Sequence, residues 1–307
     1  MGKQILSHFS PVFSNKPWAN EQGFISYYEC NHSQSIKKGP TGRKQWGRKR
    51  GIYSKDVEHS LDQDLENKAA PIFEKLISIE EISISERKKW AQFLLSQIVR
   101  TPSFIEYEQH ACDLAGIDQK PDHDRVGCEE CGDLHFVANR DWCYLFAHED
   151  DYFVRTDNPV LLTGFIERPE TCLFYPLTPK ICLSVCSMHS GWNPYKHAPQ
   201  EMMALELSKG MAHMFNFHLA KCTQRSLIIS PEHDGLVSES MFKDILGMYP
   251  QPPFPIHVLE SSSSADEAYE SVRRIMCSLD GIVYPEWSIS EIEPFYRPHH
   301  REGVAYP

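Results

Sequence analysis

Four side chains from separate segments of the chain could together form an active site: His8, Glu66, Arg100 and Asp157. An imidazole moves protons near neutral pH, and a guanidinium holds a phosphate or a carboxylate through two contacts. Two carboxylates can act as a general base or bind a divalent cation. Together these groups suit hydrolysis of a phosphodiester or a nucleotide. The alternative is structural: Arg100 forms a buried ion pair with Glu66 or Asp157, and His8 bonds to backbone.

Asp157 stands in the stretch YFVRTDNPVLL, residues 152–162, where polar residues separate two apolar runs. Asp and Asn favour turns because they hydrogen-bond nearby backbone, and a residue before proline is pushed toward extended geometry. The pattern predicts either a capped strand end or a strand that carries a carboxylate to the rim of a sheet. We expect Asp157 to lie near Arg100, since regular backbone bonding stops at both places.

The spacing Cys128-Glu129-Glu130-Cys131-Gly132 is that of a zinc knuckle, in which glycine relieves the turn that aims backbone amides at the thiolates. A structural zinc site needs four ligands, and the chain has no second Cys-x-x-Cys pair. The remaining ligands could come from His110, Cys112 and His123 upstream, or from His135 and Cys143 downstream. The alternative is a pair of surface thiols. Any bound metal is therefore expected to be one zinc at Cys128 and Cys131.

A basic segment occupies residues 37–50, KKGPTGRKQWGRKR, and contains no acid. Its seven cations are Lys37, Lys38, Arg43, Lys44, Arg48, Lys49 and Arg50. A basic, glycine-rich run that contains Trp46 could be a mobile loop that contacts nucleic-acid phosphate, or simply a solvated loop. The net charge of −11 argues against bulk attraction of the whole chain to nucleic acid.

The elements that must position these residues follow from apolar periodicity. Residues 57–78 and 84–115 have helical spacing, with a capping box at Ser83 and Glu86 and a kink or break at 100–102. A further helix fits 200–222. The predicted strands are 23–29, 142–147, 152–156, 160–162, 172–175, 181–187 and 226–230. This order predicts an α+β fold, in which the strands at 142–187 form one mostly antiparallel sheet packed by the two long helices.

The order of these elements predicts that the chain is divided into two parts. The first is an α+β domain over residues 1–237, with a polar, Cys-containing insertion near 118–135, and the second is an extension over residues 238–307 that packs on it.

Several short motifs, in consistent order over roughly residues 7–230, resemble the family catalogued as domain of unknown function 4238, which is found mostly in bacteria. The motifs are His8-Phe9-Ser10-Pro11, Trp18-Ala19, Gly51-Ile52-Tyr53, Leu65-Glu66, Ala70-Pro71, Gln97 to Pro102, Thr156 to Val160, Pro176 to Pro179, and Asn216 with Arg225. Ser7 stands where the family commonly has a second His, which weakens a two-histidine metal site. The family has no established activity, so the resemblance places Asp157 in a family motif without implying a reaction.

Composition places the chain among globular proteins, with 41% hydrophobic and 24% charged residues. No apolar run approaches the roughly 20 residues that span a bilayer, and no signal peptide is recognisable, so we expect a cytoplasmic protein without membrane contact. Its cysteines are then expected as free thiols or metal ligands. The sequence lacks a P-loop, a dinucleotide-binding glycine pattern and a G-x-S-x-G elbow. Two hypotheses stay open: a phosphoester hydrolase (a nuclease or a nucleotide-hydrolysing effector), or a non-catalytic regulatory protein that binds nucleic acid or protein through the basic segment.

Overall fold

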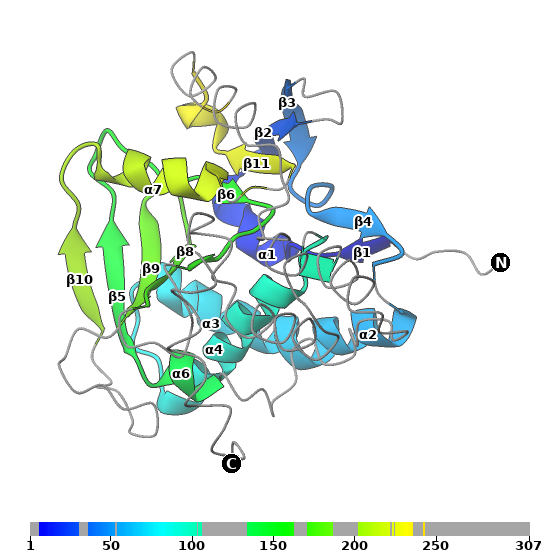
Figure 1. The fold of residues 1–307 in the computed structure, drawn as a ribbon, viewed down its shortest axis with the longest axis vertical. Helices are drawn as coiled ribbons and strands as arrows, with labels where there is room; N and C mark the ends of the chain where they lie inside the picture. The colour runs from blue at the N-terminus through cyan, green and yellow to red at the C-terminus, as the bar shows by residue number, and fades with distance from the viewer. Residues whose placement is uncertain are drawn as a thin grey trace, which may run out of the picture.

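The computed structural model describes most of the chain up to residue 235 (Figure 1). The described residues are 6–30, 36–52, 54–102, 104–105, 134–162, 171–186, 202–221, 223, 225–235 and 242. Cys128 and Cys131 lie outside these ranges. The C-terminal extension predicted for 238–307 also lies outside them, except for Phe242, which packs against Tyr28 with ring centroids 5.6 Å apart.

The predicted helix over 57–78 is confirmed, and it consists of three successive parts. Helix α2 (Lys55–Ser60) begins at Ser54, whose hydroxyl accepts the backbone N–H of Val57 at 3.2 Å. A π-helical segment, η2 (Leu61–Glu66), follows it, and α3 (Asn67–Ile77) completes the run. Stretches of π-helix are rare and often occur at functional sites. Here the stretch ends at Glu66.

Helix α4 (Ile84–Val99) begins with the predicted capping box. The Ser83 hydroxyl accepts the Glu86 N–H at 3.2 Å, and the Glu86 carboxylate accepts the Ser83 N–H at 2.8 Å. The helix ends before Arg100, so residues 100–102 break it. Residues beyond 105, where the helix was expected to continue, lie outside the described part.

Five strands form the larger sheet, in the order β10-β5-β9-β8-β7. They are β10 (Met203–Glu206), β5 (Asp141–Phe146), β9 (Ile181–Cys186), β8 (Leu173–Pro176) and β7 (Leu161–Leu162). All neighbours are antiparallel except β10 and β5, which are parallel. The helix expected over 200–222 is therefore wrong in its first half, where pairing with β5 overrides helix propensity. Its second half is confirmed as α7 (Met211–Lys221).

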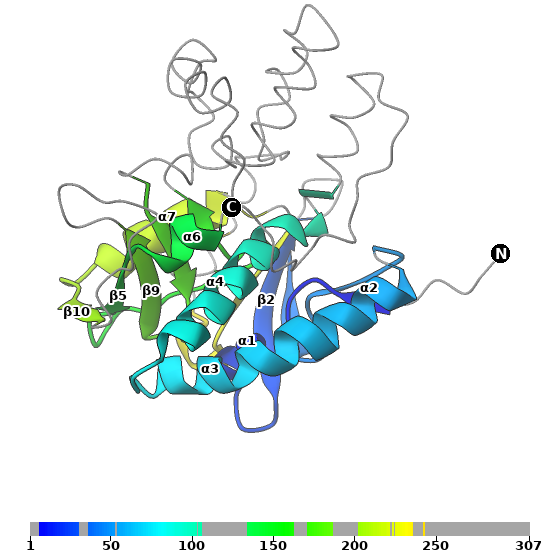
Figure 2. The same cartoon turned by 90° about the horizontal axis from the view of Figure 1, so that it is seen from below.

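Helices cover both faces of this sheet. Trp142, Tyr144 and Leu183 belong to the same core as the aromatic residues of α3 and α4, whereas Cys143 and Leu145 pack with Ala212 of α7. Figure 1 shows α7 on one side of the sheet, and Figure 2 shows α3 and α4 on the other. Because helices cover both faces of the sheet, apolar residues of β5 follow one another in the sequence instead of alternating with polar ones.

The smaller sheet has the order β3-β2-β11-β6 and is antiparallel throughout. Its strands are β3 (Ile36–Gly42), β2 (Phe24–Cys30), β11 (Ser226–Ile229) and β6 (Arg155–Thr156). The expectation that all strands of 142–187 share one sheet is therefore wrong for the segment that contains β6. The polar stretch at 157–159 separates the two pairings, because β6 pairs with β11 whereas β7 pairs with β8.

Arg155 joins the two sheets at this point. Its buried guanidinium donates to the Tyr175 hydroxyl at 2.7 Å, to the Ser14 hydroxyl at 3.0 Å and to the Pro176 carbonyl at 3.3 Å. It also lies over the rings of Trp18 and Tyr175, with centroid distances of 5.6 and 4.8 Å. The planar guanidinium can stack on rings and donate in several directions at once, which a lysine could not reproduce.

The remaining elements are short. A two-stranded antiparallel ribbon consists of β1 (Leu6–His8) and β4 (Arg48–Arg50). The short helices are α1 (Val12–Asn15), η1 (Lys16–Trp18), α6 (Leu134–Ala138) and η4 (Pro231–His233). The basic segment at 37–50 is therefore not the loop that was expected. Most of it pairs as β3 and β4, and only residues 43–47 form the turn between them.

Candidate functional site

Arg100 gathers two of the other predicted site residues around its guanidinium. Its Nη1 lies 2.8 Å from Glu66 Oε1, and its Nη2 donates to the backbone carbonyl of His8. Glu58 completes the group, because its Oε1 accepts the His8 N–H at 3.0 Å and lies 3.6 Å from His8 Nδ1. We call His8, Glu58, Glu66 and Arg100 the Arg100 cluster. It ties β1 to α2, to the π-helical segment and to the end of α4.

Burial acts differently on the two carboxylates of the Arg100 cluster. The Arg100 side chain is 1% exposed, and that of Glu66 is 17% exposed. Burial raises the pKa of Glu66 above its ordinary value, although the charge of Arg100 opposes this. Burial also acts to raise the pKa of Glu58, but hydrogen bonds from His8 and the charge of Arg100 outweigh it, so that pKa is lowered. Neighbouring carboxylates whose pKa values are shifted in opposite directions occur both at acid–base catalytic sites and in structural networks of ion pairs.

Asp157 lies where β6 ends beside β11. Its Oδ2 accepts the backbone N–H groups of Arg225 and Ser226, both at 2.8 Å. Its own N–H donates to the Ser226 carbonyl at 3.0 Å, and the Thr156 hydroxyl donates to the Asn158 carbonyl at 2.6 Å. Both interpretations of the 152–162 stretch therefore hold. The polar residues bond the backbone at a strand end, and the carboxylate lies at the rim of a sheet.

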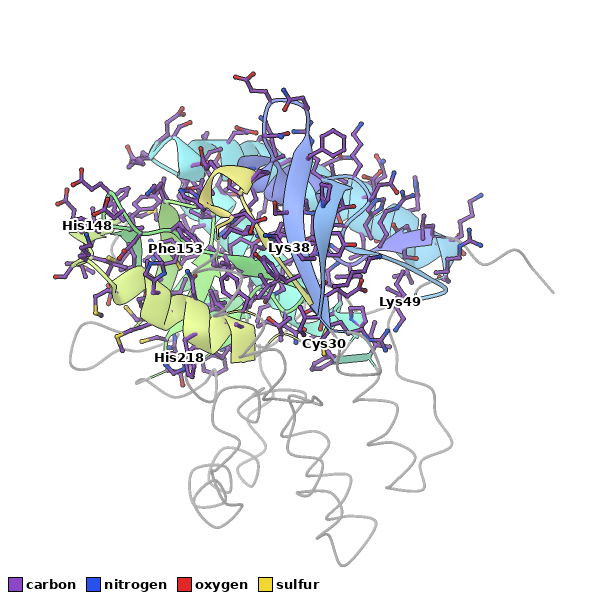
Figure 3. All side chains as sticks on the ribbon, turned by 90° about the horizontal axis from the view of Figure 1, so that it is seen from above. Cys30, Lys38, Lys49, His148, Phe153 and His218 are labelled. Atoms are coloured by element: carbon purple, nitrogen blue, oxygen red, sulfur yellow. The ribbon has the colours of Figure 1, made fainter. Side chains whose placement is uncertain are left out.

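A pocket of about 350 Å³ opens beside Asp157. Its charged and aromatic lining comes from several parts of the chain: Phe9, Tyr27, Glu29, Trp46, Arg48, Lys49, Asp157 and Arg225. Tyr27 and Glu29 come from β2, and Arg48 and Lys49 come from β4. Figure 3 shows Lys49 toward the end of β2 that carries Cys30. Pockets for small ligands typically measure roughly 300–1,000 Å³, so this one has room for a nucleotide-sized molecule.

The turn at residues 45–47 builds one wall of the pocket. Gly47 has a φ of +78°, and its carbonyl accepts the N–H groups of Phe9 and Ser10 at 2.9 and 3.2 Å. A Cβ at this position would lie 2.4 Å from the Cβ of Ser10, so only glycine fits. Next to it, the indole N–H of Trp46 donates to the Ser226 hydroxyl at 3.1 Å, and its ring meets Phe9 edge-on. The turn thereby fixes an aromatic face at the pocket.

The Arg100 cluster adjoins this pocket along the chain. Phe9 and Pro102 line the pocket, and they lie one residue after His8 and two residues after Arg100. The structure thus brings His8, Glu66 and Arg100 together and places Asp157 on the neighbouring pocket. The predicted proximity of Arg100 and Asp157 stays a prediction.

Two of the seven predicted nucleic-acid-binding cations, Arg48 and Lys49, line the pocket. Lys38 instead lies 3.0 Å from Asp234 and over the Tyr28 ring, and Lys37 lies over the Tyr27 ring. Lys44 and Arg50 are exposed, and Arg43 is half-buried. The basic segment is therefore distributed over both faces of the smaller sheet and the ribbon, and only part of it faces the pocket.

Sequence reasoning named Trp46 only as a member of the basic segment and missed Tyr27, Glu29 and Arg225 as pocket residues. Tyr27 and Glu29 alternate along β2 with the buried Tyr28, and this alternation was visible in the sequence. Their face became a pocket wall only because β4 and the Trp46 turn lie against it. That pairing joins segments distant in the chain and has no local signal.

The zinc prediction falls on Cys128 and Cys131, which lie outside the described residues. Of its candidate downstream ligands, Cys143 is 4% exposed and packs in an apolar cluster, where its thiol donates to the Tyr144 carbonyl at 3.4 Å. Burial lowers the pKa of His135. Within the described ranges, no three His, Cys, Asp or Glu side chains are grouped as metal ligands, and no helix there is long and apolar enough to cross a membrane.

Comparison with known proteins finds a family similarity over part of the chain, and that family has no assigned reaction. No curated protein and no solved structure gives a significant match. The family model described as "Protein of unknown function (DUF4238)" matches residues 7–127, a range that includes the Arg100 cluster and the pocket residues of β2 and β4. Asp157 and Arg225 lie beyond the matched range. On this match, residues 7–127 of the chain are similar to the DUF4238 family.

Proposed function

We propose that the pocket beside Asp157 binds a nucleotide, either free or as part of a single-stranded nucleic acid. One observation carries the proposal: three aromatic side chains and three cations line the same pocket of about 350 Å³. Aromatic rings stack on nucleobases of any sequence, and arginine and lysine bind phosphate. The aromatic residues are Phe9, Tyr27 and Trp46, and the cations are Arg48, Lys49 and Arg225.

Contacts with neighbouring residues help to place two of the three cations, Arg48 and Arg225. The Arg48 Nη1 donates to Gln45 Oε1 at 2.9 Å, which orients the guanidinium. The backbone of Arg225 is fixed by the Asp157 carboxylate. The chain as a whole has a net charge of −11 and would repel a long polyanion. A small ligand or a short single strand therefore suits this pocket better than a duplex.

A second candidate function, hydrolysis of a phosphoester in that ligand, is favoured by the two acids of the pocket, Glu29 and Asp157. A carboxylate near a bound phosphate can orient or deprotonate a water or hold a divalent cation. The neighbouring cations would stabilise the negative charge that develops on the phosphate oxygens. In this case Asp157 contacts the reacting water, and the Arg100 cluster positions the Phe9 wall. A non-catalytic regulatory protein would bind the same ligand without turnover.

Binding is tested with the full chain against nucleoside mono-, di- and triphosphates and against fluorescently labelled single-stranded RNA and DNA oligomers. We expect Lys49→Gln and Arg225→Gln each to weaken binding about tenfold, because each removes a charge-assisted contact. Arg50→Gln is the matched control, since Arg50 neighbours Lys49 on β4 but does not line the pocket. Equal affinity for wild type, Lys49→Gln and Arg50→Gln, or no binding to any of these ligands, would refute the proposal.

Hydrolysis is tested on whichever ligands bind, by following release of phosphate or shortened oligomers. Asp157→Asn should abolish turnover and leave binding within a few fold, because the amide keeps the shape of the side chain and removes the charge. Turnover that persists in this variant would exclude the catalytic role of Asp157. Binding without any turnover in wild type would leave the regulatory function standing.

A further inference from the structure

Two cysteines lie opposite each other at the end of the β8–β9 pair. The register of these antiparallel strands matches Leu173 with Val185, so one further step places Cys172 opposite Cys186. Alternation along the strands puts both on the face that carries Phe174 and Cys182, which is the face toward α7. Opposite residues of antiparallel strands have Cα atoms roughly 4.5–5.5 Å apart, which is within the range that a disulfide spans.

The contacts of Cys186 distinguish it from the other described thiols. The Cys172 thiol hydrogen-bonds to Cys186 and lowers the pKa of Cys186 to about 7, against the effect of burial. Ser184 also lowers this pKa by a hydrogen bond, Asp141 on the adjacent strand opposes it, and Arg140 assists it. By contrast, burial raises the pKa of Cys30, Cys143 and Cys182.

Solvent exposure also distinguishes Cys172 and Cys186 from the buried thiols. Cys143 and Cys182 are buried, with 4% and 1% of their surface exposed, whereas Cys172 and Cys186 are half-buried. A thiol that reacts must be ionised and reachable, and a second thiol nearby resolves the first product into a disulfide. Cys172 and Cys186 meet these conditions as a pair, and the two buried thiols do not.

We infer that Cys172 and Cys186 are a reversible dithiol–disulfide pair, oxidised by a low-molecular-weight disulfide such as oxidised glutathione. The Cys186 thiolate attacks one sulfur of the glutathione disulfide, forms a mixed disulfide and releases one glutathione thiolate. Cys172 then loses its proton and attacks the Cys186 sulfur, which forms the Cys172–Cys186 bond and releases the second glutathione. Two protein thiols are oxidised, and one glutathione disulfide is reduced to two thiols. Reduced glutathione in excess reverses both steps. This site is independent of the pocket and of its proposed ligand.

Peptide mapping of the full-length protein tests the pair. After incubation with oxidised glutathione, alkylation and non-reducing trypsin digestion, we expect a cross-link between the peptides 156–180 and 181–196. The second peptide also contains Cys182, so the Cys182→Ala variant is the matched control and should keep the cross-link. Cys186→Ser should lose it. Cys172→Ser should instead accumulate glutathione on Cys186, because no resolving thiol is left.

Reaction with iodoacetamide gives a second measurement on unmodified wild-type protein, which does not depend on any variant folding. Cys186 should alkylate about tenfold faster than Cys30 near neutral pH, because a larger fraction of it is thiolate. A wild-type digest in which both peptides are found only singly, as glutathione or alkyl adducts, would overturn the inference. Loss of the cross-link in Cys182→Ala would overturn it as well, and would assign the bridge to Cys182.

Discussion

Arg100 and Glu66 form an ion pair of 2.8 Å that joins the end of α4 to the end of the π-helical segment. The same guanidinium donates to the His8 carbonyl, so β1 is held to both helices. Pro102, two residues after Arg100, and Phe9, one residue after His8, line the pocket. The ion pair therefore sets the position of two pocket walls without itself lining the pocket.

Glu66→Ala should destabilise the protein by roughly 3 kcal/mol, because removing one partner leaves Arg100 buried beside a reduced set of acceptors. We place the loss at the low end of the range for buried pairs, since the His8 carbonyl and the charge of Glu58 remain. Urea unfolding monitored by tryptophan fluorescence measures the change. Pocket-ligand binding should weaken in parallel, as the Phe9 and Pro102 walls loosen.

The double variant Glu66→Leu with Arg100→Met separates the charge effect from packing. It removes both charges and fills similar volume, so it should recover at least half of the stability that Glu66→Ala loses. A double variant that is less stable than Glu66→Ala would show that the guanidinium bond to the His8 carbonyl, rather than the ion pair, holds this corner.

Asp157→Asn and Asp157→Ala should differ sharply in stability. The Asn side chain retains an oxygen that can accept the N–H groups of Arg225 and Ser226, so its cost should stay near 1 kcal/mol. Ala removes both bonds at a buried strand end and should cost about 2–4 kcal/mol. Thermal unfolding of both variants, compared with wild type, measures the difference. Equal losses in the two variants would mean that the charge of Asp157, and not its acceptor geometry, stabilises the strand end.

Local signals in the sequence were sufficient for most helices and strands. The capping box at Ser83 and Glu86 fixes the start of α4, and the alternation and turn residues at 172–187 give β8 and β9. The strand β10 was missed because Met, Ala, Leu and Glu favour helix, and only pairing with β5 makes this stretch extended. Local propensity cannot report a partner that lies 60 residues earlier in the chain.

The candidate site likewise contains residues that were predicted from the sequence and residues that were not. His8, Glu66, Arg100 and Asp157 were predicted as one group, and the structure brings the first three together. Glu58 was not predicted, although it lies two helical turns before Glu66. Exposed acidic residues are common on such helices, so nothing in the sequence distinguished Glu58 from them. The pocket was missed entirely, because it forms where β4 and the Trp46 turn lie against β2. Gly47 is required at that contact because an added Cβ would meet Ser10, and this requirement is visible only in the structure.

Gly47→Ala should destabilise the protein far more than an ordinary glycine replacement. The new Cβ would lie 2.4 Å from Ser10 Cβ at a φ of +78°, so the ribbon and the turn must separate. Gly210→Ala is the matched control, because Gly210 has a φ of +88° with no atom within 4 Å of its added Cβ. The control isolates the cost of the backbone conformation, about 1–2 kcal/mol. A Gly47→Ala loss no larger than that of the control would contradict the steric account.

Acid should destabilise the protein partly through Glu86. A hydrogen bond from Lys75 at 2.7 Å and the backbone N–H of Ser83 at 2.8 Å lower the pKa of Glu86 from 4.5 to about 2. Because the folded pKa is depressed, the carboxylate stabilises the fold above pH 4.5, and this contribution is lost as the pH falls from 4.5 toward 2. Glu86→Gln should therefore lower the melting temperature near neutral pH and flatten its dependence on pH in the acid range.

Lys75→Gln provides the matched control for this pH dependence. It removes the largest cause of the lowered Glu86 pKa but leaves the capping bond from Ser83, so its pH profile should fall between those of wild type and Glu86→Gln. Glu66 has the opposite effect on the pH dependence of stability. Its pKa is raised in the folded protein, so its contribution to stability falls as the pH rises through that pKa. Differential scanning calorimetry across the acid range compares the three proteins at fixed ionic strength. Parallel profiles for wild type and Glu86→Gln would show that the capping box does not set the acid stability of α4.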